Sequence, residues 1–447
     1  MRVGLSKRQR LSGLDAGNAF QTEGLFVMNA HISSFSIDVP LAGLRSSVES
    51  DMTPAKPAEI TVSVHVLMSA LEADWRELEA SNTVSLHQSF DWCASWVMTH
   101  VERPLFLRGR LGDRTVFILP LELVRNGLFR TARFIGSPHS NINTGLFAED
   151  LGGLPPEKLA AFILDELIAK LAHVADIITL EKMPLEWRGL PHPLASLPSI
   201  RNQNSSYQLP LLPDFAATLA QINAKRRRKK FRVSERRMES YGGYDYIIAD
   251  SLDERRAILD VFLAQKAARF EALGLPNVFR DASTQAFLRA AISQDGTLEN
   301  RPLSLHALRL RSDADSRIVA IAGVSRKGDH MICQFGSIDE TLAADASPGE
   351  LLFYRIIERA CSEGVRLFDF GIGDQPYKRS WCTVETPHHD IVLPLTVRGR
   401  LAAGVHRLIV RTKRAIKSNR SVYAAVQRFR QKHQGKISPA STDVEAD

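Results

Sequence analysis

Hydrophobic and polar positions along the chain alternate with two periods, which predict strands and helices in a definite order. Residues 104–124 form two alternating runs about a Gly-Asp turn, the pattern of a β-hairpin. A short strand is expected near residues 132–135, and residues 155–172 carry apolar side chains at helical spacing. Residues 176–180 predict another strand. The first part of the chain is therefore expected to run hairpin, strand, helix, strand.

The same order recurs in the second half of the chain. Strands are expected at residues 304–310, 317–325 and 330–337, ahead of a helix that starts at Pro348 and a strand at residues 365–370. Repetition at so long a period indicates tandem domains rather than a solenoid. Mixed strands with helices on both faces make an α/β (α+β) fold. We therefore expect two domains, each a mixed central sheet flanked by helices.

Four segments follow from this pattern. Residues 1–57 are rich in Ser, Gly and Ala with little periodicity, and are expected to be a disordered lead. Residues 58–224 are expected to form the first domain. Residues 225–397 are expected to form the second domain. Residues 398–447 are expected to form a basic helix followed by a disordered tail.

The composition is that of an ordinary globular protein. Of the 447 residues, 44% are hydrophobic and 24% are charged, and no apolar run approaches the roughly 20 residues of a membrane span. The basic start MRVGLSKRQR is not followed by an apolar core, so no signal peptide is expected, and Met28 is an alternative start to Met1. The four cysteines show neither paired spacing nor a C-x-x-C motif, so neither disulfides nor zinc is expected and the cytoplasm is the expected compartment.

The net charge of +7 is unevenly distributed. Residues 225–237 hold nine Lys or Arg and one Glu, and residues 398–436 hold twelve Lys or Arg and no acid. The rest of the chain holds 36 basic and 49 acidic residues, a net charge of −13. This distribution describes an acidic body with two basic patches. It is not that of a protein that coats nucleic acid uniformly, and a nucleic-acid partner is not expected.

The stretch from Ser347 to Trp381 combines a helix, a strand and a second short helix. Pro348 suits the first turn of a helix, where a missing N–H costs nothing, and Gly364 suits its end. The strand ends in Gly371-Ile372-Gly373-Asp374, after which a second helix begins. A helix N-terminus that faces a cleft is a ready site for an anion, because its N–H groups and its dipole point at the ligand.

These motifs resemble the C-terminal acyltransferase domain of the cellulose-biosynthesis-associated family within the GNAT N-acyltransferase superfamily. The resemblance is carried by Ser347-Pro348-Gly349, Leu351-Leu352, Gly373-Asp374, Pro376-Tyr377-Lys378 and Trp381. It extends, more weakly, over roughly residues 85–397. It implies tandem GNAT-like domains, of which the first, residues 58–224, is a degenerate half that is structural or binds the acceptor, and the second, residues 225–397, carries the chemistry. It also implies acetyl-CoA or another acyl-CoA as co-substrate, with no metal. The usual GNAT pyrophosphate loop, Q/R-x-x-G-x-G/A, is absent before the helix.

The first helix start of this stretch is the expected site of the donor's pyrophosphate, which backbone N–H groups would hold. The expected cofactor-binding residues are Ser347, Pro348, Gly349, Glu350 and Leu351.

Acyl transfer needs donors for the developing oxyanion, a base for the nucleophile and an acid for the leaving thiolate. Tyr377 is the candidate acid, because the resemblance places it close to the CoA sulfur, and the alternative is packing against the sheet edge. Asp369 alternates with two phenylalanines, so it is either a base in the cleft or the solvent face of a strand. Asp374 is either a carboxylate that orients the acceptor or the N-cap of the second helix.

Four further side chains are candidates for substrate binding. Lys378 would bind phosphate or an acidic group of the acceptor, Arg269 would hold the acceptor, and Gln334 would line the acyl groove. Trp381 belongs to the same motif. The alternatives are a solvated lysine, a surface arginine and a polar residue of a core strand. His306, His388 and His389 lack ligand spacing, and no metal site is expected.

The sequence predicts an acyl-CoA-dependent N- or O-acyltransferase that acts on a sugar or polysaccharide precursor, by direct attack of the acceptor on the thioester. One alternative is a Fem-like transferase that carries an aminoacyl group from tRNA to a cell-wall precursor, for which the basic helix at residues 225–237 is suited. A second alternative is a non-catalytic scaffold of a polysaccharide synthase.

The basic segment 398–436 is predicted to contact an anionic membrane surface. Leu401, Val405, Leu408 and Ile409 recur near a helical face among its cations. Such a helix lies in the plane of the lipid headgroups, which predicts peripheral contact with the inner membrane. The alternative is a helix that packs on the second domain with its charges in water.

Overall fold

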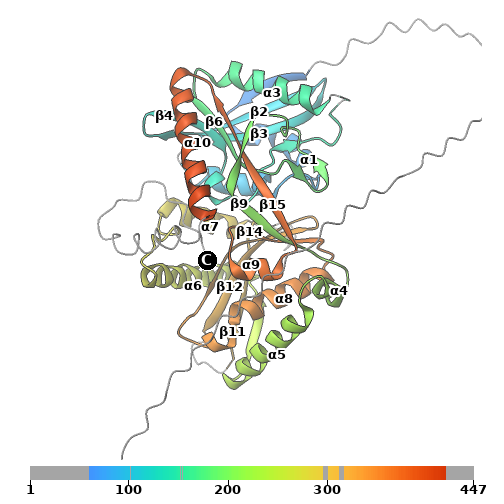
Figure 1. Ribbon diagram of the computed structural model, residues 1–447, viewed down its shortest axis with the longest axis vertical. Helices are drawn as coiled ribbons and strands as arrows, with labels where there is room; N and C mark the ends of the chain where they lie inside the picture. The colour runs from blue at the N-terminus through green and yellow to red at the C-terminus, as the bar shows by residue number, and fades with distance from the viewer. Residues whose placement is uncertain are drawn as a thin grey trace, which may run out of the picture. The chain divides into compact units, whose positions relative to one another are not determined.

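The computed structural model describes residues 60–100, 102–151, 153, 155–294, 301–311 and 317–418. The lead predicted at residues 1–57 lies outside the described residues, as does the chain beyond residue 418. Within the described part, one mixed sheet runs in the order β1-β2-β3-β4-β6-β15-β9-β14-β13-β12-β11-β10, and β5 pairs with β3 (Figure 1). In Figure 1, blue and green elements of the first half surround one end of this sheet, and orange elements of the second half surround the other.

The first half contains a four-strand antiparallel run followed by a helix and a parallel strand. Its elements are β1 (Ile60–His65), α1 (Glu72–Glu79), α2 (Phe90–Val97), β2 (Arg103–Leu111), β3 (Arg114–Asn126), β4 (Phe129–Phe134), β5 (Leu146–Phe147), α3 (Pro156–Leu171), β6 (Ile177–Met183), the hairpin β7 (Glu186–Trp187) and β8 (Leu190–Pro191), and β9 (Ser199–Pro210).

The second half repeats this order. Its elements are α4 (Phe215–Ala220), α5 (Ala224–Ser240), β10 (Tyr244–Ile248), α6 (Leu252–Ala272), α7 (Ala282–Ser293), β11 (Ser304–Leu310), β12 (Ile318–Lys327), β13 (His330–Ile338), α8 (Pro348–Ser362), β14 (Leu367–Ile372), α9 (Pro376–Trp381), β15 (Val384–Pro394) and α10 (Val397–Ser418). The hairpins, helices and strands expected at residues 104–180 and 304–370 are confirmed.

Local sequence signals account for the helix starts of the second half. The Ser251 hydroxyl accepts a hydrogen bond from Glu254 N at the start of α6, and Asp281 accepts one from Thr284 N at the start of α7. Such caps satisfy N–H groups that have no partner within the helix. Pro348 stands in the first turn of α8, as the sequence predicted.

The last strand of each half crosses to the other half. β9, from the first half, pairs antiparallel with β14 of the second, and β15, from the second half, pairs antiparallel with β6 of the first. β9 and β15 also pair with each other along most of their length. The exchange joins the two halves into one continuous sheet through backbone hydrogen bonds.

In each half, two parallel strands pair briefly and then separate. β4 and β6 pair only from Thr131 to Arg133, and β13 and β14 only from His330 to Ile332. A register shift in the β12–β13 ladder at Gly323/Val324 bends β13 just after this point. Beyond these pairs, the backbone N–H and C=O groups of β13 and β14 no longer bond to each other. Other parts of the chain must therefore supply their hydrogen-bond partners.

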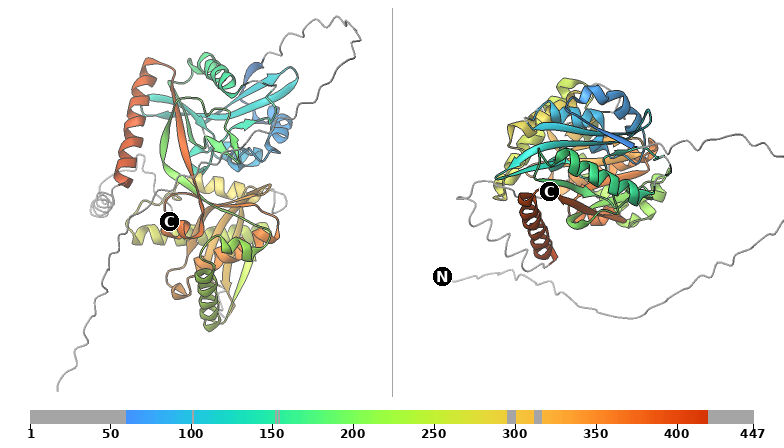
Figure 2. Two further views of the ribbon diagram at one scale, coloured as in Figure 1. Left: turned by 45° about the vertical axis from the view of Figure 1, so that its right-hand side comes forward. Right: turned by 90° about the horizontal axis from the view of Figure 1, so that it is seen from above.

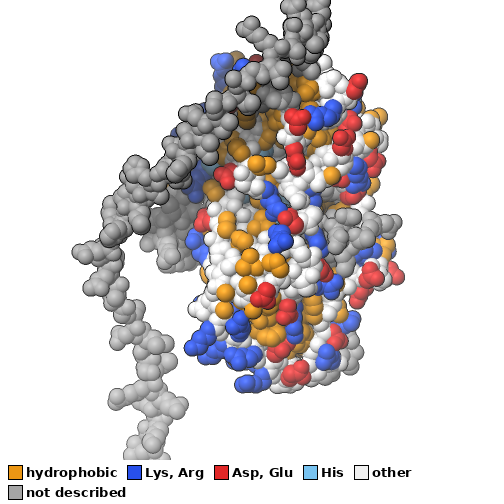
Figure 3. Space-filling model, turned by 90° about the vertical axis from the view of Figure 1, so that its right-hand side faces the viewer, with side chains coloured by type: hydrophobic (Ala, Val, Ile, Leu, Met, Phe, Trp, Pro, Cys, Tyr) orange, Lys and Arg blue, Asp and Glu red, His pale blue; other side chains and the backbone are white. Residues whose placement is uncertain are grey.

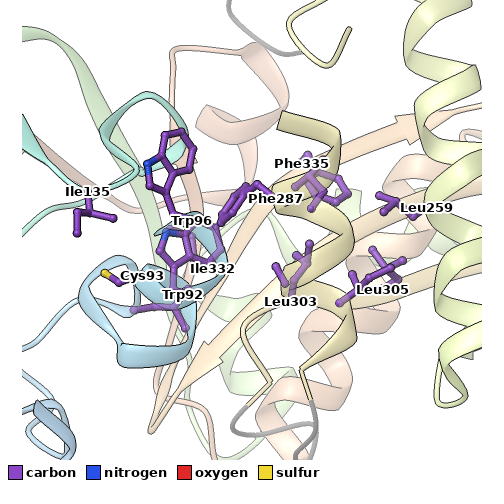
Figure 4. Packing of buried hydrophobic residues seen from close by; sticks show 14 of the residues in the cluster. Trp92, Cys93, Trp96, Ile135, Leu259, Phe287, Leu303, Leu305, Ile332 and Phe335 are labelled. Carbon is purple, nitrogen blue, oxygen red and sulfur yellow. The ribbon is translucent and has the colours of Figure 1, made fainter. Parts of the chain in front are cut away.

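A hydrophobic core is shared by the two halves. Trp92 and Trp96, from α2 of the first half, pack edge-on against Phe287 of α7, with ring centroids 5.0 and 5.2 Å apart. Figure 4 shows the two indole rings and the Phe287 ring facing one another, with Phe335 of β13 beyond them. Because all four rings are buried, their packing holds α2 of the first half against α7 and β13 of the second half.

Candidate functional site

Where β13 and β14 separate, a loop of the first half reaches between them. Asn141 Nδ2 donates to Gln334 Oε1 at 3.0 Å, and Ile372 N donates to Asn141 Oδ1 at 3.1 Å. One amide side chain therefore bridges β13 and the end of β14. The loop leaves β4 at Gly136 and ends at Gly145, both with positive φ that glycine adopts at low cost.

His87 completes this cluster from the first half. Its Nε2 lies 3.1 Å from Gln334 Oε1 and 3.3 Å from Asn141 N, and its Nδ1 lies 3.1 Å from Ile142 O. Burial lowers the pKa of His87 to about 4, so the imidazole is neutral at neutral pH and donates through only one nitrogen. In the described part of the chain, Gln334 Nε2 is buried and has no hydrogen-bond partner. The Gln334 side chain therefore offers an amide N–H donor at the point where β13 and β14 separate.

The sequence predicted that Gln334 lines the acyl groove, which stays a prediction, and it missed His87 and Asn141. The loop GSPHSNINTG was recognised only as polar. His87 and Asn141 lie 247 and 193 residues from Gln334 in the chain, so nothing local links them.

Asp369 is fully buried, so the interpretation as the solvent face of a strand is wrong. Its Oδ2 accepts from Gln208 Nε2 at 2.7 Å, and its Oδ1 accepts from Gly371 N at 2.6 Å. His330 Nε2 lies 3.7 Å from the carboxylate. Burial by itself would raise the pKa of Asp369, but the electrostatic attraction of the nearby His330 ring and the hydrogen bonds from Gln208 and Gly371 N outweigh it and hold the pKa below its usual value. Such a carboxylate stays ionised and is a weak base.

Asp374 lies beyond the end of β14 on the surface. It pairs with Arg379, with Nη2 and Oδ2 2.7 Å apart, and both side chains are more than half exposed. The N-cap of α9 is Gln375, whose side chain makes no capping bond. The interpretation of Asp374 as the N-cap is therefore wrong, and its assignment to the acceptor stays a prediction.

Tyr377 lies on α9 next to the strand end. Its ring stacks on Phe353 of α8, with centroids 5.9 Å apart, and meets Phe370 of β14 edge-on at 6.0 Å. The side chain is half-buried. It therefore packs against the sheet and also reaches the surface, so the two interpretations of this residue are compatible.

Lys378 and Trp381, on the same helix, point into the protein. Lys378 is 4% exposed and its Nζ donates to Ile372 O at 2.6 Å, which holds the end of β14. The interpretation of Lys378 as a solvated lysine is therefore wrong. Trp381 is fully buried, and the Arg227 guanidinium lies 3.9 Å over its ring. In this conformation neither side chain reaches an acceptor in solution, and both position α9.

The start of α8 is the predicted pyrophosphate site. Ser347 N donates to Ala344 O at 3.1 Å, and the N–H groups of Glu350 and Leu351 both donate to Ser347 O, at 3.1 and 3.2 Å. Proline has no N–H, so Gly349 carries the remaining backbone donor of the five predicted residues.

The carboxylate of Glu350 contacts two cations of α5. Its Oε1 accepts from Arg227, which is buried, and its Oε2 lies 3.7 Å from Lys230. The start of α8 is thus placed beside a strongly basic helix. Figure 3 shows Lys and Arg side chains gathered at the lower edge of one face, where Figure 1 places α5.

Arg269, near the end of α6, pairs with Glu340, which follows β13. Its side chain is 25% exposed, so it is only partly on the surface, and its assignment to the acceptor stays a prediction. No group of three or more His, Cys, Asp or Glu side chains in the described part of the chain is arranged to hold a metal. The same part contains no helix that is long and apolar enough to cross a membrane.

Comparison with known proteins agrees with this geometry. Residues 225–379 match the family model for the acetyltransferase (GNAT) domain, and this range contains β13, α8, β14 and part of α9. No protein with curated annotation matches the chain. The match lies in the second half, and the first half repeats the order of its elements. The chain is a mixed α/β protein with a large mixed sheet flanked by helices, so the predicted fold class is confirmed.

Solved structures are similar at low sequence identity. The structure of FemX is 13% identical with a TM-score of 0.53, over 75% of this chain and 97% of that one. The C-terminal domain of a putative lysylphosphatidylglycerol synthetase from Agrobacterium fabrum is 12% identical with a TM-score of 0.47, over 77% and 96%. A tandem GNAT protein from the clavulanic acid biosynthesis pathway is 12% identical with a TM-score of 0.42, over 75% and 99%.

Proposed function

We propose that the protein is an acyl-CoA-dependent N- or O-acyltransferase whose acceptor is a sugar or polysaccharide precursor. The observation that supports it best is the GNAT match over residues 225–379, which include the separated strands β13 and β14 and the helix start at Pro348. The acceptor class rests on the sequence resemblance to the cellulose-biosynthesis-associated family.

In this proposal the donor's pyrophosphate lies at the start of α8, near Gly349 and the cations of α5, and its thioester lies between β13 and β14. Gln334 Nε2 supplies a hydrogen-bond donor to a developing oxyanion. The acceptor attacks the thioester carbonyl directly, so that a C–N or C–O bond forms as the C–S bond breaks. The acceptor's proton passes to water, and Tyr377 protonates the leaving thiolate. Asn141 and His87, from the first half, hold the Gln334 amide in place. The first half would thus contribute to the site.

All four cysteines are free thiols, at positions 93, 333, 361 and 382. Free thiols persist in reducing compartments, so we propose that the protein works in the cytoplasm.

A second candidate is transfer of an aminoacyl group from tRNA, as the Fem-like alternative has it. It is favoured by the basic helix α5, on which Lys225, Arg228, Lys229 and Arg232 are exposed. The likeness to the FemX structure shows the fold alone. Titration calorimetry with acetyl-CoA, and separately with aminoacyl-tRNA, distinguishes the two donors. Heat of binding with acetyl-CoA supports the first proposal, and heat with aminoacyl-tRNA alone overturns it in favour of the second. The absence of both favours a scaffold.

Replacing Gly349 by Asp is expected to weaken acetyl-CoA binding by at least about tenfold, because it places a negative charge beside the remaining N–H donor of the helix start. A Cβ at this position would meet Ile338 Cγ2 at 3.0 Å, so some of the effect could be steric. Gly349→Ala adds the same Cβ without the charge and is the matched control. Calorimetry on both folded variants measures the difference, and equal affinities would place the phosphates elsewhere.

Tyr377→Phe is expected to lower kcat by about tenfold to a thousandfold, which is the range of general acid contributions, with little change in KM for the donor. The phenyl ring retains the stacking on Phe353. Tyr241→Phe removes a hydroxyl that bonds Asp345 on the surface of the same half and is the control. Steady-state kinetics with an acceptor that the unaltered protein acylates gives kcat for both variants. A kcat for Tyr377→Phe equal to that of Tyr241→Phe would disprove the role of Tyr377 as the acid.

A further inference from the structure

Helix α10 buries one face against the sheet. Ala402, Ala403 and Val410 are at most 9% exposed, and the helix packs on β15, β9 and β6. At Gly399 an added Cβ would lie 1.7 Å from Asp176 O, so the start of the helix approaches the sheet as closely as a glycine allows. Figures 1 and 2 show α10 along the outer edge of the first half. The alternative prediction, that this helix packs on the second domain, is therefore only partly correct, because β6 belongs to the first domain.

The opposite face of α10 is apolar and exposed. Val397, Leu401, Val405 and Leu408, here called the apolar stripe, are 80%, 65%, 47% and 67% exposed. Their spacing of i, i+4, i+8 and i+11 places them on one side of a helix, away from the buried alanines. The stripe runs for about 16 Å at 1.5 Å per residue. Packing on the sheet therefore leaves a second hydrophobic surface without a cover among the described residues.

Arginines border the apolar stripe. Arg400, Arg407 and Arg411, here called the arginine border, are exposed and recur at i, i+7 and i+11 along one side of it. No acidic side chain within the described ranges forms an ion pair with any of the three. The sequence from residue 398 to 436 contains no Asp or Glu. Neither α10 nor the sequence up to residue 436 contains an acidic residue that could pair with these cations.

We propose that α10 docks on an anionic lipid surface, with the apolar stripe inserted at the level of the headgroups and the arginine border on the lipid phosphates. A helix with aliphatic side chains on one side and cations along its border is suited to this interface. The face packed on β15 and β6 fixes the orientation, so the protein body sits above the membrane with α10 beneath it. The inference goes beyond the transfer reaction and does not depend on the donor.

The charge pattern disfavours two other occupants. A second copy of α10 across a two-fold axis would bring arginine borders near each other with no acid on either helix to separate them. Nucleic acid would pair with the arginines but would leave the aliphatic stripe without a partner, because base stacking uses aromatic side chains. An anionic lipid surface satisfies both the stripe and the border.

Sedimentation of the full-length protein with vesicles tests the proposal. Vesicles of equal parts phosphatidylglycerol and phosphatidylcholine are compared with vesicles of phosphatidylcholine alone, at low and at high salt. We expect binding to the anionic vesicles that salt weakens. Leu401→Glu combined with Leu408→Glu should abolish it. Replacing Arg400, Arg407 and Arg411 together by Gln should weaken it on the order of a hundredfold, since each cation near such a surface contributes about fivefold.

Leu67→Glu is the matched control, because Leu67 is 67% exposed just after β1, which is three strands away from β4 in the sheet. It should bind as the unaltered protein does, and circular dichroism should show all variants folded. The proposal is overturned if the Leu401/Leu408 variant binds anionic vesicles normally, or if neutral vesicles bind equally well. It is also overturned if the unaltered protein stays in the supernatant, or if the stripe variant instead loses self-association in sedimentation equilibrium without lipid.

Discussion

Acidification from neutral pH to about 4 is expected to unfold this protein, because it buries several neutral imidazoles. The side chains of His87, His192, His306 and His388 are at most 5% exposed. Burial lowers the pKa of His306 to about 3 and the pKa of each of the other three to about 4, against an ordinary value of 6.5. An imidazole whose pKa is lower in the folded than in the unfolded state makes the free energy of unfolding depend on pH.

The sign of the effect follows from proton uptake. Above pH 6.5 these histidines are neutral in both states and contribute no pH dependence. Between about 6.5 and 4 the unfolded chain takes up protons that the folded chain does not, so stability falls with falling pH. Each depressed pKa contributes about 3 kcal/mol by pH 4. Four together contribute on the order of 10 kcal/mol, which is comparable with the whole stability of a typical protein, about 5–15 kcal/mol.

Two buried glutamates act in the opposite direction. Burial raises the pKa of Glu79 and of Glu122, so the folded state takes up these two protons more readily than the unfolded state. Their contribution offsets part of the loss at the acid end, and the histidine contribution remains the larger.

Denaturant unfolding at a series of pH values measures the effect. The slope of unfolding free energy against pH gives the number of protons taken up on unfolding, and we expect these four imidazoles to contribute nearly four protons to it near pH 5. His306→Gln should lower that number by about one between pH 6.5 and 4, whatever it does to stability at neutral pH, where Tyr246 OH bonds to this ring. Stability that stays level down to pH 4 would contradict the prediction.

The sequence could predict elements but not the exchange of strands. The hairpin at residues 104–124 and the helix at 155–172 are set by local periodicity, and the structure places β2–β3 and α3 there. The sequence of a strand such as β9 indicates an extended segment, but not which strand it will pair with. Its partners β14 and β15 lie far along the chain, and the pairing depends on the assembled halves.

The same limit applies to the site. Alternation showed that Asp369 faces away from Phe368 and Phe370, but its environment depends on β9, which supplies Gln208. The motif marked Lys378, on α9, as a substrate-binding group, although its side chain turns inward to Ile372 O at the end of β14. His87 and Asn141 carried no local signal, because they act on a strand of the other half. Chemistry shared between halves is visible only once the fold brings them together.

The contrast between Asp369 and Asp374 leads to the second large expected effect. Asp369→Leu should lower the unfolding free energy by about 3–5 kcal/mol, because it removes the acceptor for Gln208 Nε2 and for Gly371 N in a fully buried site. Both donors would then lose their hydrogen bonds where water does not replace them. His330 would also lose the charge 3.7 Å from its Nε2.

Asp374→Leu is the matched control, five residues further along the chain. Its ion pair with Arg379 is between side chains that are 52% and 56% exposed, and such surface pairs contribute about 0–1 kcal/mol. Urea unfolding at neutral pH compares the two variants with the unaltered protein. Equal losses, or a change below about 1 kcal/mol for Asp369→Leu, would show that the buried carboxylate does not hold β14 against β9. A large loss confined to Asp369 would mean that one of the two predicted catalytic aspartates is first of all a structural group at the junction of the halves.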